Sequence, residues 1–356
     1  MIVKFLHISD LHLCDTFKTQ TFFDPYAKRQ MQWRALERAV SYANQKNVHF
    51  LLLSGDVYER EYFTSAHCRR FLDVIAGFQG IQTIMIGGNH DYYQGVSVFD
   101  GEKAPKNFTL VREDGIVSLD FPSYQTTIWA HSWTQPSYEK NQVDKLLSQR
   151  LDFKNRFNIF MVHSGLETDG PYFPMSLKEL PHAFDYIALG HVHKPGVVDR
   201  NAAYAGSLEP LSMKETGTHG GILGMLDTVD ESLQLYFSDL SLSEYLDVVV
   251  NVDEKTIQEI EKEICGQKNG EKETALRVTL TGRMHHTIYP KELQAVLLEH
   301  FSKVQVRDAR IEYKEDHIEN SFIDRLKKQM ESQHLRYEYQ EKVLRKALDL
   351  LWRTGK

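Results

Sequence analysis

The sequence predicts an α/β fold followed by a second, smaller α/β unit. Three observations support this prediction. Short apolar runs of strand length alternate with amphipathic helices in the first half of the chain, most of these runs end at a motif of polar residues, and a β-α-β-α-β pattern follows from about residue 243. Strands that alternate with helices are typical of a sheet covered by helices.

The first unit is expected to begin with a strand, a long helix and a second strand. The helix is expected at Tyr26–Gln45, because Trp33, Leu36 and Val40 recur at spacings of three or four residues. A second helix is expected at Ala66–Ala76. The expected strands are Val3–Ile8, Phe50–Leu53, Thr83–Ile86, Tyr124–Trp133, Ile159–Val162 and Tyr186–Leu189, followed by a strand-rich segment from Tyr204 to Phe237.

We predict three parts of the chain: a main domain at residues 1–242, a small α/β capping domain at 243–316 and a helical tail at 317–356. The expected elements of the second part are, in order, strand Asp247–Val252, helix Glu254–Ile264, strand Ala275–Leu280, helix Pro290–His300 and strand Gln305–Tyr313. The tail shows helical periodicity, and both packing against the capping domain and docking to a partner protein are compatible with it.

Composition and charge exclude several classes of protein. The net charge of −7 gives the 356-residue chain no general affinity for nucleic acid, so a nucleic-acid substrate would have to be attracted locally. The three cysteines Cys14, Cys68 and Cys265 are far apart, which argues against a disulfide framework and against a zinc ribbon. No signal peptide and no apolar stretch of about 20 residues is visible. We therefore expect a cytoplasmic protein that does not enter a membrane.

Five short motifs rich in histidine and aspartate follow the expected strands. They supply carboxylate, imidazole and amide groups, all suited to divalent metals, whereas no serine, cysteine or lysine stands out as a nucleophile. Side chains in loops beyond neighbouring strand ends can converge on one point. The motifs are Asp10-Leu11-His12, Gly55-Asp56, Gly88-Asn89-His90-Asp91, His163-Ser164-Gly165 and Gly190-His191-Val192-His193.

These side chains match what hydrolysis of a phosphodiester requires. Two metal ions about 3.5–4 Å apart can neutralise the phosphoryl oxygens and activate a water molecule. A carboxylate must bridge such a pair, and Asp56 is the natural candidate. Asp10 and His12 are alternate residues, which point the same way in an extended backbone and could bind one ion. Nitrogen and oxygen donors without thiolate suit manganese, iron or zinc, and we expect manganese.

His90 is expected to act on the substrate and not as a metal ligand, because adjacent side chains diverge and Asn89 already provides a ligand oxygen. It could stabilise the transition state or protonate the leaving alkoxide. Asp91 could orient the His90 imidazole. A purely structural role of Asp91 in an Asx-type turn is an equal alternative.

At these residues the sequence resembles the calcineurin-like metallophosphoesterase superfamily. Its signature, D-x-H, G-D, G-N-H-[DE], a histidine near glycine and G-H-x-H, is present between residues 10 and 193. The resemblance implies a four-layer α/β/β/α sandwich with a dinuclear centre at one edge and His90 as the catalytic histidine. One ion would be held by Asp10, His12, Asp56 and His193. The other ion would be held by Asp56, Asn89, His163 and His191.

Within that superfamily the chain is similar to the SbcD-type DNA repair exonucleases. The similar segments are Phe5 to His12 and Tyr204 to Pro210, and a capping domain follows. This likeness implies DNA as substrate and an SbcC-like coiled-coil ATPase bound through the tail. Some features depart from relatives. The stretch Val57 to Arg60 lacks a further histidine that some relatives carry, and Glu59 stands in place of the second aspartate of serine/threonine phosphatases. Residues 247–316 hold 14 acidic and 11 basic residues, which gives no direct support for DNA binding.

The sequence therefore predicts a metal-dependent DNA exonuclease that uses two divalent ions. One alternative is a phosphodiesterase or pyrophosphatase acting on a nucleotide or another small phosphodiester. A second alternative is an inactive scaffold that binds DNA or the ATPase. The sequence does not identify residues that bind the substrate, and it is compatible with a homodimer.

Overall fold

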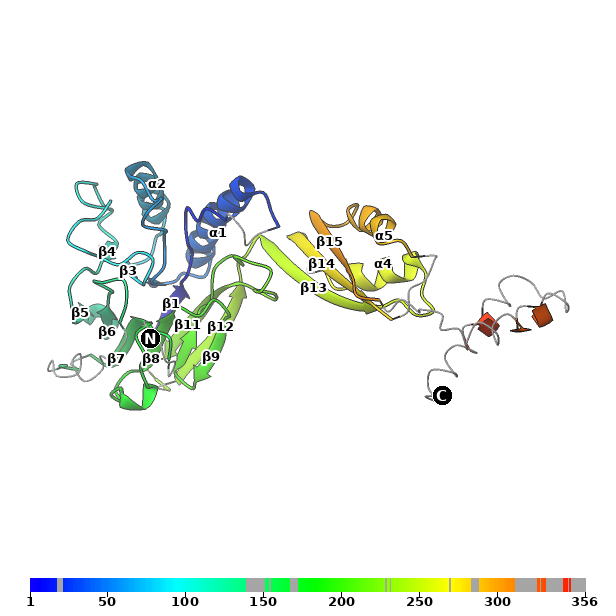
Figure 1. Ribbon diagram of the computed structural model, residues 1–356. Helices are drawn as coiled ribbons and strands as arrows, with labels where there is room; N and C mark the ends of the chain where they lie inside the picture. The colour runs from blue at the N-terminus through cyan, green and yellow to red at the C-terminus, as the bar shows by residue number, and fades with distance from the viewer. Residues whose placement is uncertain are drawn as a thin grey trace.

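The computed structural model describes residues 1–17, 22–138, 151–153, 155–166, 172–227, 229–230, 232–268, 270–282 and 288–310, with 325–326, 328–330, 342–344 and 346 in the tail. Two six-stranded sheets form the body, and a three-stranded sheet forms a second unit (Figure 1). The predicted helical tail, residues 317–356, falls mostly outside the described residues. No described helix is long and apolar enough to cross a membrane.

The first sheet has the strand order β12-β11-β1-β2-β3-β4. Its strands are β1 (Ile2–Ile8), β2 (Phe50–Ser54), β3 (Gln82–Ile86), β4 (Phe108–Leu110), β11 (Gly220–Asp227) and β12 (Ser232–Asp239). Strands β1 to β4 are parallel, and β11 and β12 extend the sheet antiparallel. Every residue of β2 is buried, which explains why its sequence is an unbroken apolar run.

The second sheet has the strand order β5-β6-β7-β8-β10-β9. Its strands are β5 (Ile116–Phe121), β6 (Thr126–His131), β7 (Phe157–His163), β8 (Tyr186–Gly190), β9 (Gly196–Asp199) and β10 (Ala202–Tyr204). Strands β6, β7, β8 and β10 are parallel. The short 3-10 helix η1 (Pro122–Tyr124) precedes β6, so this strand begins later than the sequence predicted.

The two sheets pack face to face around a common core. Phe5 and Phe50 from the first sheet and Ile159 and Tyr186 from the second belong to this cluster. On the outer face of the first sheet lie the helices α1 (Pro25–Gln45) and α2 (Ser65–Ala76), in the two positions where the sequence predicted helices. This arrangement confirms the predicted α/β sandwich.

The outer face of the second sheet is covered differently. Trp133, Tyr138, Phe173 and Phe184 pack there with the 3-10 helix η2 (Leu177–Glu179) close by. Over the described residues, loops and this short helix cover that face; residues 139–150 are not among them.

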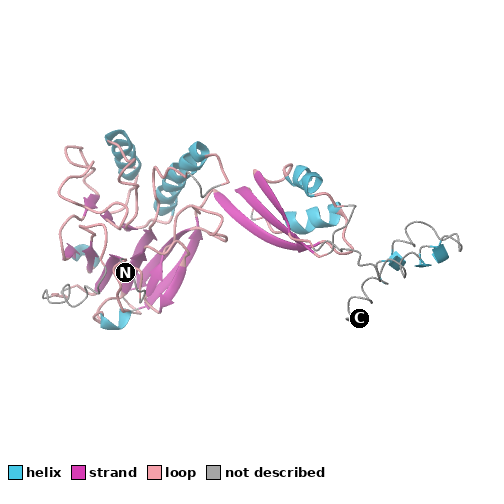
Figure 2. Ribbon diagram, viewed as in Figure 1, coloured by secondary structure: helices cyan, strands magenta, loops and turns pink. Residues whose placement is uncertain are grey.

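The second unit is a parallel three-stranded sheet with two helices (Figure 2). Its elements are β13 (Ser243–Asn251), α4 (Ile257–Cys265), β14 (Glu273–Thr281), α5 (Pro290–Leu297) and β15 (Lys303–Asp308). This order is the predicted β-α-β-α-β pattern. Val248 is buried while Val249 is 67% exposed, so only one face of the sheet is packed by the helices. The domain boundaries at 243 and 316 remain predictions.

A buried ion pair joins this second unit to the body. The Lys28 ammonium on α1 donates to Glu209 at 2.9 Å and to the hydroxyl of Ser243, the first residue of β13, at 2.5 Å. Lys28 and Ser243 are fully buried and Glu209 is nearly so. Buried charges are tolerated when they are paired and hydrogen-bonded, as they are here. The pair therefore fixes where β13 leaves the body.

Candidate metal centre

The five motifs lie together at one edge of the sandwich, because each follows the carboxyl end of a parallel strand. Asp10 follows β1, Asp56 follows β2, Asn89 follows β3, His163 ends β7 and His191 follows β8. Apart from His163, these residues sit in loops, and all the strands before them belong to rigid sheets. The sheets thus hold ligands that are up to 181 positions apart in the sequence within hydrogen-bond distance of one another.

Three groups of side chains have donor atoms close enough to hold a metal ion. In each group all the donor atoms lie within 4.8 Å of one another. The groups are Asp10, His12 and His193; Asp56, His163 and His191; and His12, Asp56 and His90. The first two correspond to the two ion positions that the family resemblance implies. The third group links them through Asp56.

Distances within the site place Asp56 between the two groups. Its Oδ2 atom lies 3.3 Å from His163 Nε2 and 3.8 Å from His12 Nε2. Asn89 Oδ1 lies 3.1 Å from the same His163 nitrogen. The structure therefore brings all seven predicted ligands into one cluster, with Asp56 between the two groups of donors.

Asp10 and His12 converge for a reason other than the one we predicted. Strand β1 ends at Ile8, and the φ angles of Asp10 and His12 are 51° and 45°, so the backbone is left-handed and not extended. Their N–H groups donate to the carbonyls of Gly55 and Asp56. Asp56 and His191 also have positive φ, at 50° and 102°. Strained backbone at four ligand positions is typical of a functional site.

The imidazoles are oriented for metal binding through their Nε2 atoms. His12 Nδ1 meets Glu59 at 2.6 Å, His193 Nδ1 meets Glu215 at 3.1 Å, and His163 Nδ1 meets the carbonyl of Ser54 at 3.0 Å. A ligating histidine almost always uses its second nitrogen in this way. The Nε2 atoms of these three histidines face the centre of the cluster.

These donors fit divalent cations. The Nε2 atoms of His12 and His193 lie only 3.2 Å apart, beside the buried carboxylates of Asp10 and Asp56. Two imidazole lone pairs and two carboxylates pointing at one place form a site for a positive ion. We propose that the site would hold two ions, with Asp10, His12, Asp56 and His193 around one and Asp56, Asn89, His163 and His191 around the other.

His90 differs from the ligands in its exposure and its partner. Its side chain is 42% exposed, while that of His163 is fully buried. His90 Nδ1 meets the second carboxylate oxygen of Glu59 at 2.9 Å. Glu59 thus holds a ligand, His12, with one oxygen and His90 with the other.

Asp91 lies elsewhere than we expected for a residue that orients His90. Its carboxylate accepts the backbone N–H groups of Asp56, Val57 and Gly88 at 2.7–3.0 Å. It therefore fixes the two loops that carry Asp56 and Asn89, which is the structural alternative considered for it. Glu59 is the carboxylate on the His90 ring.

The electrostatics of the site follow from burial and from these pairs. Burial and the charge of His163 lower the pKa of His191 to about 4, so its imidazole is neutral, the form that binds a metal. Burial would lower the pKa of His90, but the hydrogen bond to Glu59 and the charge of Asp56 raise it to about 9. Burial would raise the pKa of Glu59, and its bonds to His12 and His90 lower it to about 2.

Two glycines make room for the cluster. Gly55 has a φ of +89°, and a Cβ atom there would lie 2.5 Å from His163 Nδ1. A Cβ on Gly88 would collide with the carboxylate of Asp56 and the ring of His163. Glycine is thus required at both positions for the loops to approach each other.

Sequence reasoning missed Glu215 and the role of Glu59. Glu59 follows Asp56 by three positions, which was a usable signal. Glu215 lies 22 residues beyond His193 in a loop with no motif. It also accepts from the backbone N–H of Leu211 and from the hydroxyl of Ser207. Only the three-dimensional fold brings it to the metal centre.

Replacing Glu215 with glutamine is expected to weaken metal binding about 10- to 100-fold, because a carboxylate behind a ligating histidine orients the ring and increases its basicity. Titration of the metal-free protein with Mn²⁺ measures the change. Glu179 to glutamine, on η2, is a matched control that should bind like the wild type. An unchanged affinity in the Glu215 variant would show that His193 needs no support from it.

A two-sheet sandwich with a two-ion donor cluster at the strand ends defines a dinuclear metallophosphoesterase. The family model described as "Calcineurin-like phosphoesterase" matches residues 3–195, and the chain belongs to that family. It is accordingly a metal-dependent hydrolase of phosphoester bonds.

Curated relatives come from the same family. The chain is 26% identical over 205 residues to "DNA double-strand break repair protein Mre11" of Sulfurisphaera tokodaii, covering 53% of this chain and 49% of that protein. It is 26% identical to "Uncharacterized metallophosphoesterase YhaO" of Bacillus subtilis, covering 61% and 56%. It is 22% identical to the SbcD component of the nuclease SbcCD of Staphylococcus saprophyticus, covering 72% and 74%. The chain thus spans about half the length of the first two.

Proposed function

We propose that this protein is a metal-dependent DNA exonuclease. The observation that carries the proposal is the position of His90 in the cluster. Its side chain is 42% exposed, whereas His12 and His163 are buried and His193 is 30% exposed. An exposed, carboxylate-supported histidine beside a metal cluster is suited to act on a substrate. Relatives named as nuclease and DNA repair proteins support DNA as that substrate.

In this mechanism each residue has a distinct task. Two bound divalent ions would neutralise phosphoryl oxygens and lower the pKa of a water molecule. Asp56 would supply negative charge between the two cations, and Asp10 would supply charge to one of them. Glu59 keeps a proton on Nδ1 of His90 and stabilises the imidazolium, so that Nε2 can donate a proton to the leaving alkoxide.

The finer parts of the proposal concern the metal and the partners. We propose manganese as the metal, because the donors are nitrogen and oxygen without thiolate. We further propose that the protein acts in DNA repair in the cytoplasm with an SbcC-like coiled-coil ATPase. The relative named as a component of the nuclease SbcCD, 74% of which the chain covers, supports this.

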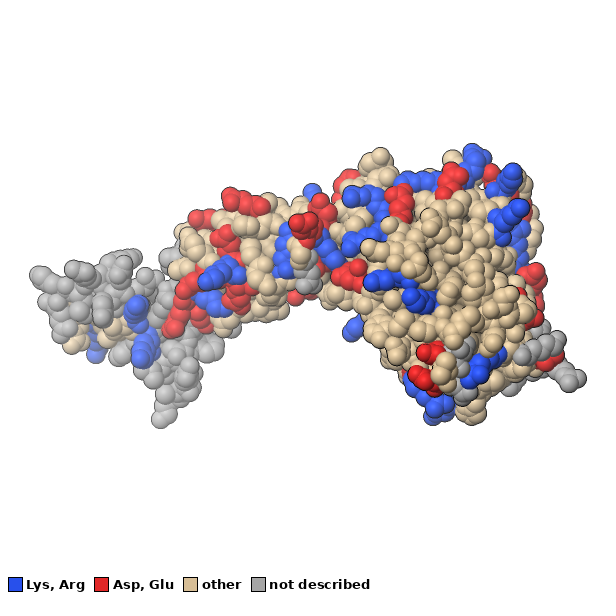
Figure 3. Space-filling model, turned by 180° about the vertical axis from the view of Figure 1, so that it is seen from behind, with Lys and Arg blue, Asp and Glu red and all other residues tan. Residues whose placement is uncertain are grey.

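Charge on the second unit is mixed. Figure 3 shows Lys and Arg interspersed with Asp and Glu over the face of this unit that it presents. With a net charge of −7, general electrostatic attraction to DNA is weak. We therefore propose that DNA is held chiefly where its phosphates meet the metal centre.

Digestion of linear double-stranded DNA tests this proposal. We expect degradation with Mn²⁺ and none after the metal is chelated. Hydrolysis of bis-p-nitrophenyl phosphate with the DNA left intact, even beside the ATPase partner, would instead favour a small-phosphodiester phosphodiesterase. DNA binding without hydrolysis of either substrate would favour the scaffold.

A further inference from the structure

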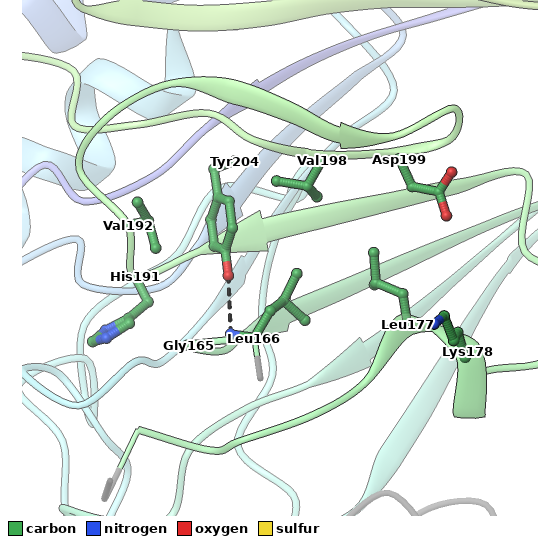
Figure 4. Close-up of a pocket in the computed structure, with 9 residues that line it drawn as sticks. All are labelled: Gly165, Leu166, Leu177, Lys178, His191, Val192, Val198, Asp199 and Tyr204. Carbon is green, nitrogen blue, oxygen red and sulfur yellow. Dashed lines mark hydrogen bonds between the residues drawn. The ribbon is translucent and has the colours of Figure 1, made fainter. Parts of the chain in front are cut away.

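A pocket opens directly beside the metal centre. Its volume is about 470 Å³, and His191, one of the ligands, forms part of its wall together with Val192 (Figure 4). This volume lies within the range of about 300–1,000 Å³ typical of small-molecule sites. A group esterified to a phosphate at His191 would therefore have this pocket within reach.

Most of the pocket wall is apolar and one aromatic ring in it is fixed. Leu166, Leu177 and Val198 line it with the ring of Tyr204. The Tyr204 hydroxyl donates to the carbonyl of Ser164 at 2.8 Å and accepts from the N–H of Leu166 at 3.1 Å. Two hydrogen bonds hold the ring in one orientation, and only 6% of Tyr204 is exposed, so the pocket offers a preformed and mainly aliphatic wall.

Two charged side chains of opposite sign also line the pocket. Lys178 and Asp199 lie on the side away from His191 in Figure 4. Lys178 provides a hydrogen-bond donor and Asp199 an acceptor. A phosphate would be repelled by Asp199, and an acyl chain would use neither charge. A flat group with apolar faces and a polar edge suits all of these surfaces.

We propose that this pocket binds one unpaired nucleobase of the substrate, on the nucleotide joined to the scissile phosphate. The inference rests on the proposed function and adds a specificity-determining subsite to it. A base inside a duplex is stacked on both faces and paired along its edge, so it has to leave the stack before it can enter a pocket. The pocket accordingly favours frayed or single-stranded ends.

Two esters with the same leaving group test the subsite. Thymidine 5′-(p-nitrophenyl phosphate) and methyl p-nitrophenyl phosphate differ in the base and sugar alone. We expect the wild-type protein to prefer the thymidine ester about tenfold or more in kcat/KM, the order of magnitude of one stacked base. Val198→Trp, which fills the pocket, should remove most of this preference through KM and leave the methyl ester unchanged.

Val197→Trp is the matched control. Val197 is the neighbouring residue on β9, is 64% exposed and does not line the pocket, whereas Val198 is 45% exposed and does. Successive residues of a strand face opposite sides, so tryptophan at 197 should leave both esters unaffected. Equal thermal midpoints of the two variants would show that both are folded.

Calorimetric titration with thymidine 5′-monophosphate and methyl phosphate separates the two proposals. The wild type should bind the nucleotide more tightly, and Val198→Trp should bind both ligands alike. A protein that leaves DNA intact but shows this difference contradicts the nuclease proposal alone. A wild type without preference for thymidine, or a Val198→Trp variant that keeps it, overturns the subsite.

Discussion

Replacing Asp56 with asparagine is expected to release both metal ions at once. The carboxylate lies within 3.3 Å of His163 Nε2 and 3.8 Å of His12 Nε2, so it reaches both groups of ligands. Asparagine keeps the size and one oxygen but loses the negative charge that offsets repulsion between two cations. Because changes behind the ligands already weaken binding about 10- to 100-fold, we expect a loss of more than about 100-fold for each ion.

Metal content after desalting, together with titration by Mn²⁺, measures this effect. Asp10→Asn is the matched control, because Asp10 belongs to one group of donors only. The Asp10→Asn substitution should lower the affinity for one ion, while the affinity for the second ion stays near its wild-type value. An Asp56→Asn protein that retains one ion at full affinity would show that Asp56 is not the bridge.

Replacing His90 with glutamine is expected to abolish most hydrolysis of DNA while the metal content stays unchanged. Loss of a general acid reduces the rate by about 10²- to 10⁴-fold, which corresponds to roughly 3–5 kcal/mol in the activation barrier. Glutamine retains a hydrogen-bond donor for Glu59 but cannot deliver a proton. The loss should appear in kcat with DNA, whose leaving alkoxide needs a proton, and should be much smaller with p-nitrophenyl esters, whose leaving p-nitrophenolate needs none.

The metal content of the His90→Gln protein decides whether His90 is a general acid or a metal ligand. The His90 donor atom lies within 4.8 Å of those of His12 and Asp56, so the geometry alone would allow it to act as a ligand. Parallel loss of metal and activity would make His90 a ligand. Glu59→Gln is a useful companion, since it removes the partner of both His12 and His90 and should reduce metal affinity as well as kcat.

The elements with strong local patterns were predicted well. β2 and α1 are within one residue of their predicted bounds, because a buried apolar run and a 3.6-residue periodicity are visible in a short window. The short strands β4, β5 and β9 were missed. β9 is exposed at all four residues and β4 has only three, so neither produces a distinct hydrophobic pattern.

The sequence by itself determined the ligand types and the strand ends from which they project. Motifs such as Gly88 to Asp91 combine a tight turn with donor side chains, and this information is local. Only the tertiary structure decided which carboxylate meets which histidine. Glu59 and not Asp91 supports His90, and Glu215 supports His193, because side-chain partners depend on loop geometry and on contacts between distant segments. The pocket beside His191 is likewise formed by five short stretches of the chain, at residues 165–166, 177–178, 191–192, 198–199 and 204.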